Sequence, residues 1–222
     1  EMCIRDSRLE DHVASARMKT TPVIDFEKNE SLKGLDYLDT IYHAIVNEHP
    51  IQLKYRSFKA RSANSFIFYP YLLKEYRNRW FVYGVRGNGR ILQNLALDRI
   101  QSLEVLPQEH YIKNTFFDPN TFFNDLVGVT KNSGSVAEKV GFKVAAAEAP
   151  YIITKPIHRS QQVVERLADG SVILEIEVVI NHELERVFFG YAEGIQVLYP
   201  KTLVELMGRK LKKAAEQYTH SK

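Results

Sequence analysis

The chain has 222 residues, of which 45% are hydrophobic and 26% are charged, a balance typical of a folded globular protein rather than a disordered one. Its apolar stretch from Val172 to Ile180 is interrupted by two glutamates and is shorter than the roughly 20 residues that a membrane-spanning helix needs. The single cysteine, Cys3, excludes an internal disulfide framework and a Cys-rich zinc site, which is typical of a cytoplasmic protein.

The net charge of +3 is unevenly distributed along the chain. Residues 51–113 hold eleven Lys and Arg against four Asp and Glu, whereas residues 114–200 hold seven against eleven. The first segment therefore carries a local charge of +7 and the second a local charge of −4. This contrast indicates two modules with different partners, and the basic module is the candidate for an anionic ligand.

The N-terminal sequence EMCIRDSR contains no apolar run and predicts no secretory signal. We expect residues 1–30 to be a truncated linker or a scar. From Ser31 or Gly34 onward, apolar residues recur at spacings of three and four as far as Val46, which predicts an amphipathic helix. His49-Pro50 ends this helix because the residue before a proline avoids the α region.

Five short strands are predicted after this helix. Alternating apolar and polar side chains predict the first, and aromatic and β-branched runs separated by turn residues predict the others. The predicted ranges are Ile51–Tyr55, Phe66–Lys74, Arg79–Arg86, Ile91–Leu97 and Ile100–Leu106. So many short strands close together favour a small β-barrel, because closure hides the strand edges.

Residues 114–135 are predicted to be a linker, since Asp118-Pro119-Asn120 and Asn132-Ser133-Gly134-Ser135 interrupt any regular element. The linker holds four phenylalanines, which predict that it docks onto a neighbouring surface: Phe116, Phe117, Phe122 and Phe123.

Residues 136–222 are predicted to form a C-terminal module in which strands and helices alternate. Strands are expected at 140–146, 161–167, 172–180 and 195–199, with helices at 147–153, at about 183–192 and from Pro200 onward. The second helix is expected to end at a C-cap glycine, Gly194. The order β-α-β-β-α-β-α is a ferredoxin-like split pattern followed by one more helix.

Catalytic and metal motifs are absent from the sequence. No two of the seven histidines stand four residues apart, and no GxSxG, Walker A or GxGxxG motif occurs. Gly87-Asn88-Gly89 indicates a hairpin turn, and Glu175 and Glu177 indicate a solvated strand face. We therefore expect no catalytic residue, no metal site and no cofactor, and a protein that is not an enzyme.

Two segments carry a resemblance to a known family. The first joins Tyr55 to Tyr69-Pro70-Tyr71-Leu72-Leu73, Arg79-Trp80-Phe81-Val82 and Leu97-Asp98-Arg99-Ile100. Its spacing resembles the WYL domain, named for a Trp-Tyr-Leu tripeptide that reads Trp80-Phe81-Val82 here. The second joins Ile157-His158-Arg159-Ser160-Gln161 to Asp169-Gly170 and Val197-Leu198-Tyr199-Pro200, and it looks like the WYL C-terminal extension. Together they cover about Leu35 to Tyr218.

The resemblance implies a fold and a role. It implies an α+β chain with a leading helix and an Sm-like, SH3-type β-barrel within residues 31–113, then a ferredoxin-like module within residues 136–222. Such proteins usually carry an N-terminal winged helix-turn-helix that binds duplex DNA, which we expect to be missing or truncated here. The two modules would sense a ligand and form a homodimer, and single-stranded DNA or RNA or a nucleotide-like effector would be that ligand. The alternative is an Sm-like oligomeric RNA-binding protein.

A site for single-stranded nucleic acid needs cations for phosphates and flat side chains for bases. The candidate ligand-binding residues are Tyr55, Arg56, Arg79, Tyr83, Arg86, Arg90 and Arg99. Arg99 could equally pair with its neighbour Asp98. The expected structural residues of the motif are Pro70, Trp80, Phe81 and Val82.

Departures from the family pattern indicate an altered pocket. Phe66, Gln93 and Ala96 stand where relatives often have basic residues, so the pocket is expected to be less basic and more aromatic. The last helix carries four cations that fit a solvated face better than a second nucleic-acid surface: Arg209, Lys210, Lys212 and Lys213.

Overall fold

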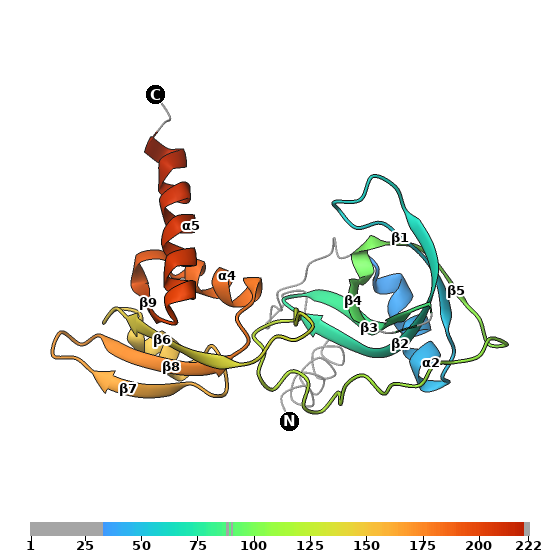
Figure 1. Cartoon of the computed structure of the whole chain (residues 1–222), viewed down its shortest axis with the longest axis horizontal. Helices are drawn as coiled ribbons and strands as arrows, with labels where there is room; N and C mark the ends of the chain where they lie inside the picture. The colour runs from blue at the N-terminus through green and yellow to red at the C-terminus, as the bar shows by residue number, and fades with distance from the viewer. Residues whose placement is uncertain (1–32, 88, 90, 220–222) are drawn as a thin grey trace, which may run out of the picture. The chain divides into compact units, whose positions relative to one another are not determined.

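The structure is a computed structural model, and it describes residues 33–87, 89 and 91–219 (Figure 1). Two of the expectations, a linker or scar at residues 1–30 and a ligand-binding role for Arg90, lie outside the described residues. Two antiparallel sheets, one of five strands and one of four, carry the fold, which confirms a mixed α+β protein. No described helix is both long and apolar enough to cross a membrane.

The first sheet has the strand order β4-β3-β2-β1-β5. Its strands follow the 3₁₀ turn η1 and the helix α2, at Leu35–Tyr37 and Leu38–Val46, and they occupy Ile51–Tyr55 (β1), Asn64–Tyr76 (β2), Arg79–Arg86 (β3), Leu92–Ala96 (β4) and Ile100–Val105 (β5). All five predicted strands are therefore confirmed, with β2 longer than expected. β2 turns into β3 through Arg77 and Asn78, whose φ angles of 49° and 59° are those of a tight two-residue hairpin.

The predicted closure into a barrel is not found among the described residues. β4 and β5 stand at opposite ends of the strand order, and the 3₁₀ turn η2 (Leu97–Arg99) joins them along the chain. The prediction of closure rested on hiding the strand edges, yet β4 and β5 each pair with only one neighbouring strand in the described sheet. Instead α2 lies within the curve of the sheet (Figure 1), where Ile41 and Ala44 join the core formed by Leu53 and Phe68. The Sm-like, SH3-type assignment stays a prediction.

The residues expected to be structural in the motif differ in burial, and their role stays a prediction. Pro70 and Val82 are buried, Trp80 packs against the core from its margin, and Phe81 is half-buried. Close strand packing also requires Gly84, because a Cβ there would lie 2.1 Å from the carbonyl oxygen of Tyr69.

The second sheet has the strand order β7-β8-β6-β9. Its elements are β6 (Glu138–Val144), α3 (Ala149–Thr154), β7 (Gln162–Arg166), β8 (Val172–Val178), α4 (His182–Gly190), the 3₁₀ turn η3 (Ala192–Gly194), β9 (Ile195–Tyr199) and α5 (Lys201–Thr219). This confirms the predicted order of strands and helices, while the ferredoxin-like assignment itself stays a prediction. The core of this module includes Phe142 and Phe188, whose ring centroids lie 5.1 Å apart.

The expected glycine C-cap of α4 is wrong. The helix ends at Gly190, and the residue with a left-handed φ of 44° is Ala192. Gly194 serves close packing instead, because a Cβ there would lie 2.8 Å from Cγ of Glu148.

The predicted docking of the linker phenylalanines is confirmed. Phe117, Phe122 and Phe123 surround the ring of Tyr83, with centroid distances of 6.2, 5.9 and 5.3 Å. Phe116 stacks on Tyr71 at 6.1 Å. The linker is therefore packed against the first sheet although it contains no strand or helix.

Candidate functional site

Three charged side chains meet at the η2 turn. Nε of Arg79, at the start of β3, lies 3.2 Å from Oδ2 of Asp98. Nε of Arg99 lies 3.7 Å from Oδ1 of the same carboxylate, too far for a hydrogen bond. Both alternatives raised for Arg99 therefore remain open, because its ion pair with Asp98 is loose and the carboxylate is shared with Arg79.

Two of the predicted arginines lie over phenylalanine rings. The guanidinium of Arg99 is 4.4 Å from the ring centroid of Phe58, which is 74% exposed in the loop between β1 and β2. The guanidinium of Arg86, at the end of β3, is 4.0 Å from the ring centroid of Phe66 on β2. Cation–π contacts of this kind hold a guanidinium in place without neutralising it. The ring of Phe66 thus supports the guanidinium of Arg86.

Tyr55 connects these two contacts. It lies two residues beyond Leu53, the partner of Phe66 in the β1–β2 ladder, so Tyr55 and Phe66 share one face of the sheet. At the other side Tyr55 approaches Arg99, and the backbone N–H of Arg56 donates to the carbonyl of Arg99 at 3.1 Å. Burial raises the pKa of the Tyr55 hydroxyl, and the charge of Arg99 opposes this shift only in part. Tyr55 therefore stays a neutral hydrogen-bonding group at physiological pH.

These contacts define a surface that we call the basic–aromatic row. It comprises Tyr55, Arg56, Phe58, Phe66, Arg79, Arg86, Asp98 and Arg99. This set contains four arginines and one carboxylate, which contacts Arg79 and Arg99. No ion pair among the described residues involves Arg56 or Arg86. The row therefore has an excess of positive charge beside ring faces, which suits a ligand with both phosphates and bases.

Tyr83 lies apart from the row. It is 2% exposed, and its hydroxyl donates a hydrogen bond to the carbonyl oxygen of Val129 in the linker. In the ladders it pairs with Leu72 and Asn94, on the face opposite to Val82 and Arg86. Of the seven predicted ligand residues, Arg79 and Arg99 meet at Asp98 and Tyr55 approaches Arg99, while Arg86 contacts Phe66 separately. Tyr83 contacts the linker, and Arg90 is outside the described residues.

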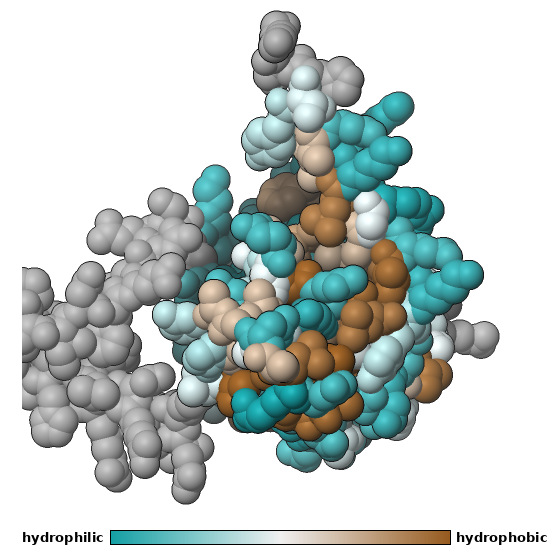
Figure 2. All heavy atoms as spheres, turned by 90° about the vertical axis from the view of Figure 1, so that its left-hand side faces the viewer, coloured by the Kyte–Doolittle hydropathy of each residue, from teal (hydrophilic) through white to brown (hydrophobic). Residues whose placement is uncertain are grey.

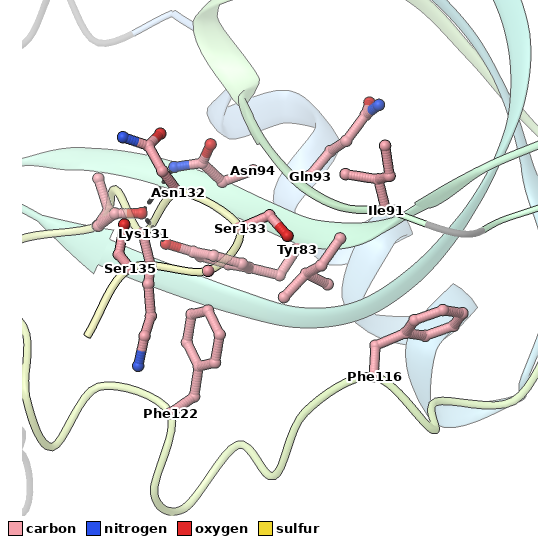
Figure 3. Close-up of a pocket in the computed structure, with 13 residues that line it drawn as sticks. Tyr83, Ile91, Gln93, Asn94, Phe116, Phe122, Lys131, Asn132, Ser133 and Ser135 are labelled. Carbon is pink, nitrogen blue, oxygen red and sulfur yellow. Dashed lines mark hydrogen bonds between the residues drawn. The ribbon is translucent and has the colours of Figure 1, made fainter.

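On the face of Tyr83 the structure also has a cleft that the sequence analysis did not predict. A cleft of about 300 Å³ opens between β4 and the linker (Figure 3), and its lining includes Tyr83, Ile91, Asn94, Phe122, Lys131, Asn132 and Ser133. Tyr83 and Asn94 both donate to the carbonyl of Val129, the latter at 2.7 Å. No local pattern could have revealed it, because Asn94 and Val129, which lie on its two walls, are 35 residues apart in the sequence.

The linker next to this cleft is also held by the C-terminal module. The side-chain amide of Asn181 donates to the carbonyls of Val127 and Thr130, each at 2.9 Å. The hydroxyl of Thr130 donates to Glu183 at 2.7 Å. Residues 127–130, which we call the strap, therefore form hydrogen bonds both with the first sheet and with the C-terminal module.

The C-terminal module keeps apolar side chains at its surface. Figure 2 shows brown apolar areas among the teal polar ones on this side of the molecule. Its exposed large hydrophobic residues include Val163 and Val164 on the edge strand β7, Leu198 on β9 and Leu211 on α5. Within the described residues, no three His, Cys, Asp or Glu side chains gather in a way that could hold a metal ion.

A basic and aromatic surface on the first sheet, joined through a docked linker to a second α/β sheet, defines a two-module ligand-binding protein. The model of the WYL domain matches residues 36–105, and the model of the WCX domain matches residues 137–215. The chain therefore contains a WYL domain followed by a WCX domain.

Two solved structures are similar to the chain at low identity. The proteasome accessory factor B/C (PafBC) of Arthrobacter aurescens is 16% identical over 94% of this chain and 31% of that chain, with a TM-score of 0.38. A CRISPR Cas-related protein is 13% identical over 82% of this chain and 50% of that chain, with a TM-score of 0.48. The chain thus spans about a third and about half of these two proteins. A search of curated proteins found no match.

Proposed function

We propose that this chain is the effector-binding part of a WYL transcriptional regulator, and that its basic–aromatic row binds an anionic ligand. Single-stranded DNA or RNA, or a nucleotide-like molecule, is the ligand class that suits the row. The observation that carries the proposal is the pair of guanidinium groups, Arg86 and Arg99, each supported by a phenylalanine ring while Arg86 lacks an ion pair among the described residues.

The physical argument rests on what such a ligand must find. Phosphates are attracted by unpaired guanidinium groups, and this attraction weakens as salt replaces the released counterions. Bases gain about 1–3 kcal/mol each from stacking on aromatic side chains. Phe58 offers an exposed ring, and Tyr55 a neutral hydroxyl for hydrogen bonding. The carboxylate of Asp98 lowers the net charge of the row. Because it is paired with Arg79, it disfavours a ligand that contacts only this arginine.

The regulator itself requires two further features. In the proposed protein, duplex DNA is bound by a helix-turn-helix domain that precedes the WYL domain. The chain forms a homodimer, for which the exposed apolar residues of β7 and α5 offer a surface. Light scattering tests the oligomer: a dimer agrees with the proposal, whereas a hexamer or heptamer favours the Sm-like RNA-binding alternative.

Binding of a fluorescent single-stranded oligonucleotide, followed by anisotropy at low salt, tests the ligand. We expect Arg86→Ala and Arg99→Ala each to weaken binding about tenfold, which corresponds to about 1.4 kcal/mol. Arg209→Ala is the matched control, since Arg209 is an exposed arginine of α5 outside the row. Absence of binding at low salt, or an equal loss in the control, would overturn the proposal.

A further inference from the structure

Among the described residues, the lining of the cleft between β4 and the linker contains one charged side chain, Lys131, and no carboxylate. The one cation in it, Lys131, is held by the carboxylate of Asp125 at 2.8 Å to each oxygen. The other polar groups are amides and hydroxyls, of which Asn132 and Ser133 make no side-chain hydrogen bond within the described residues. A charged ligand would lose its hydration in this cleft, where the ammonium of Lys131 is already paired with Asp125 and no described carboxylate lines the walls.

The apolar part of the lining complements these polar groups. Phe122 and Ile91 contribute apolar side chains, and the ring of Tyr83 lies near Asn94 and the linker (Figure 3). A volume of about 300 Å³ is at the lower end for small-molecule sites, so a large cofactor does not fit. Amides and hydroxyls beside apolar and aromatic groups suit a small ring molecule that has its own hydrogen-bonding groups.

We propose that this cleft is a second ligand site, and that it binds a small uncharged ring molecule with amide or hydroxyl groups, the chemical class of nucleobases and nucleosides. The site goes beyond the proposed function, because it lies on the face of Tyr83 and Asn94, opposite to Arg86, and its described lining includes no residue of the basic–aromatic row. The two sites therefore differ in the charge that they accept.

The position of the cleft gives its ligand access to the strap. The carbonyl of Val129 is held by Tyr83 and Asn94, which line the cleft, and the neighbouring carbonyl of Thr130 is held by Asn181. A ligand that contacts Asn94 and Lys131 stabilises this arrangement by binding to it. Slower hydrogen exchange of the strap amides is therefore expected when the cleft is occupied.

Uridine and uridine monophosphate form a matched pair of probes, because they differ only by the charged phosphate. NMR signals of the side-chain amides of Asn94 and Asn132 report on the cleft, and those of Arg86 and Arg99 report on the row. We expect uridine to shift the cleft signals in a saturable manner and to slow exchange of the strap amides. The monophosphate is expected to bind the cleft at least about fivefold more weakly, a difference of about 1 kcal/mol.

The two proposals fail separately in this experiment. If the monophosphate leaves the row signals unchanged, a nucleotide-like ligand of the row is contradicted while the cleft proposal stands on the uridine data. If uridine leaves the cleft signals unchanged, or if both probes bind the cleft equally well, the cleft proposal is overturned.

Two variants locate the binding. Ser133→Phe fills the cleft from an exposed turn and should abolish the uridine shifts, whereas Ser102→Phe, at an exposed position of β5, should preserve them. Asp125→Asn keeps the shape of the side chain but leaves Lys131 unpaired. It should therefore move the preference of the cleft toward the monophosphate by about fivefold. An unchanged preference in Asp125→Asn would overturn the proposal even if Ser133→Phe does not fold.

Discussion

Asn181 is the residue whose replacement tests the role of the strap most directly. Its side chain is 7% exposed and makes three hydrogen bonds. Oδ1 accepts from the N–H of Leu184 at 2.9 Å and caps helix α4, while the amide nitrogen donates to the carbonyls of Val127 and Thr130. Asn181→Ala removes all three and leaves two linker carbonyls without their partners.

The cost can be estimated from these contacts. Loss of an N-cap side chain destabilises by about 1 kcal/mol. Each orphaned carbonyl adds about 1–1.5 kcal/mol, with the larger value for Val127, whose hydrogen bond is buried. The free energy of unfolding should therefore fall by about 3–4 kcal/mol. For a chain of this length such a loss lowers the Tm by about 10 °C.

Urea unfolding followed by far-UV circular dichroism measures this loss, and the fluorescence of the single tryptophan, Trp80, reports on the first sheet. Asn181→Asp keeps the capping oxygen but cannot donate to the strap, so it should recover only the capping part. Asn132→Ala, an exposed linker amide, is the control and should change stability by less than about 0.5 kcal/mol. A loss below about 1 kcal/mol in Asn181→Ala would refute this account of the strap.

Three further predictions concern packing, pH and the ligand site. Gly84→Ala should destabilise by about 1–3 kcal/mol or prevent folding, because its Cβ meets the Tyr69 carbonyl; thermal unfolding like that of the unmodified chain would contradict this. Burial lowers the pKa of His158, so its contribution to stability is present above its unfolded pKa of about 6.5 and is lost as the pH falls toward the folded pKa. Urea unfolding at several pH values should show a smaller loss in His158→Gln, and equal losses would exclude this residue as the cause. Phe66→Leu removes the ring under Arg86 and should weaken oligonucleotide binding about threefold in the anisotropy assay, whereas unchanged binding would show that the ring does not position Arg86.

Much of the fold was predictable because its elements follow local periods. Alternation in Ile51–Tyr55 and the spacing of apolar residues up to Val46 depend only on which face of an element is buried. Whether the first sheet closes into a barrel was not predictable in this way. Whether α2 or a strand ladder covers the curved face depends on contacts such as Ile41 with the sheet core, which no local pattern encodes.

The candidate site was predictable in part for the same reason. Residue type and position in the motif selected Arg79 and Arg99, which the structure places at Asp98, and Arg86, which it places over the ring of Phe66. The parity of β3 separates both Tyr83 and Arg79 from Arg86, so parity alone could not have decided which of these residues meet. The cleft and the strap could not be predicted, because Asn94, Val129 and Asn181 are joined by tertiary hydrogen bonds between distant parts of the chain.

The salt dependence of oligonucleotide binding tests the basic–aromatic row most directly. For a single strand, the slope of log K against log salt concentration is about −0.7 per phosphate contact. The proposed function predicts a clear negative slope, which becomes shallower by about 0.7 in Arg86→Ala and again in the double variant with Arg99→Ala. Arg209→Ala should keep the slope of the unmodified chain. A slope that does not change when Arg86 and Arg99 are removed would contradict the assignment of the row as the ligand site.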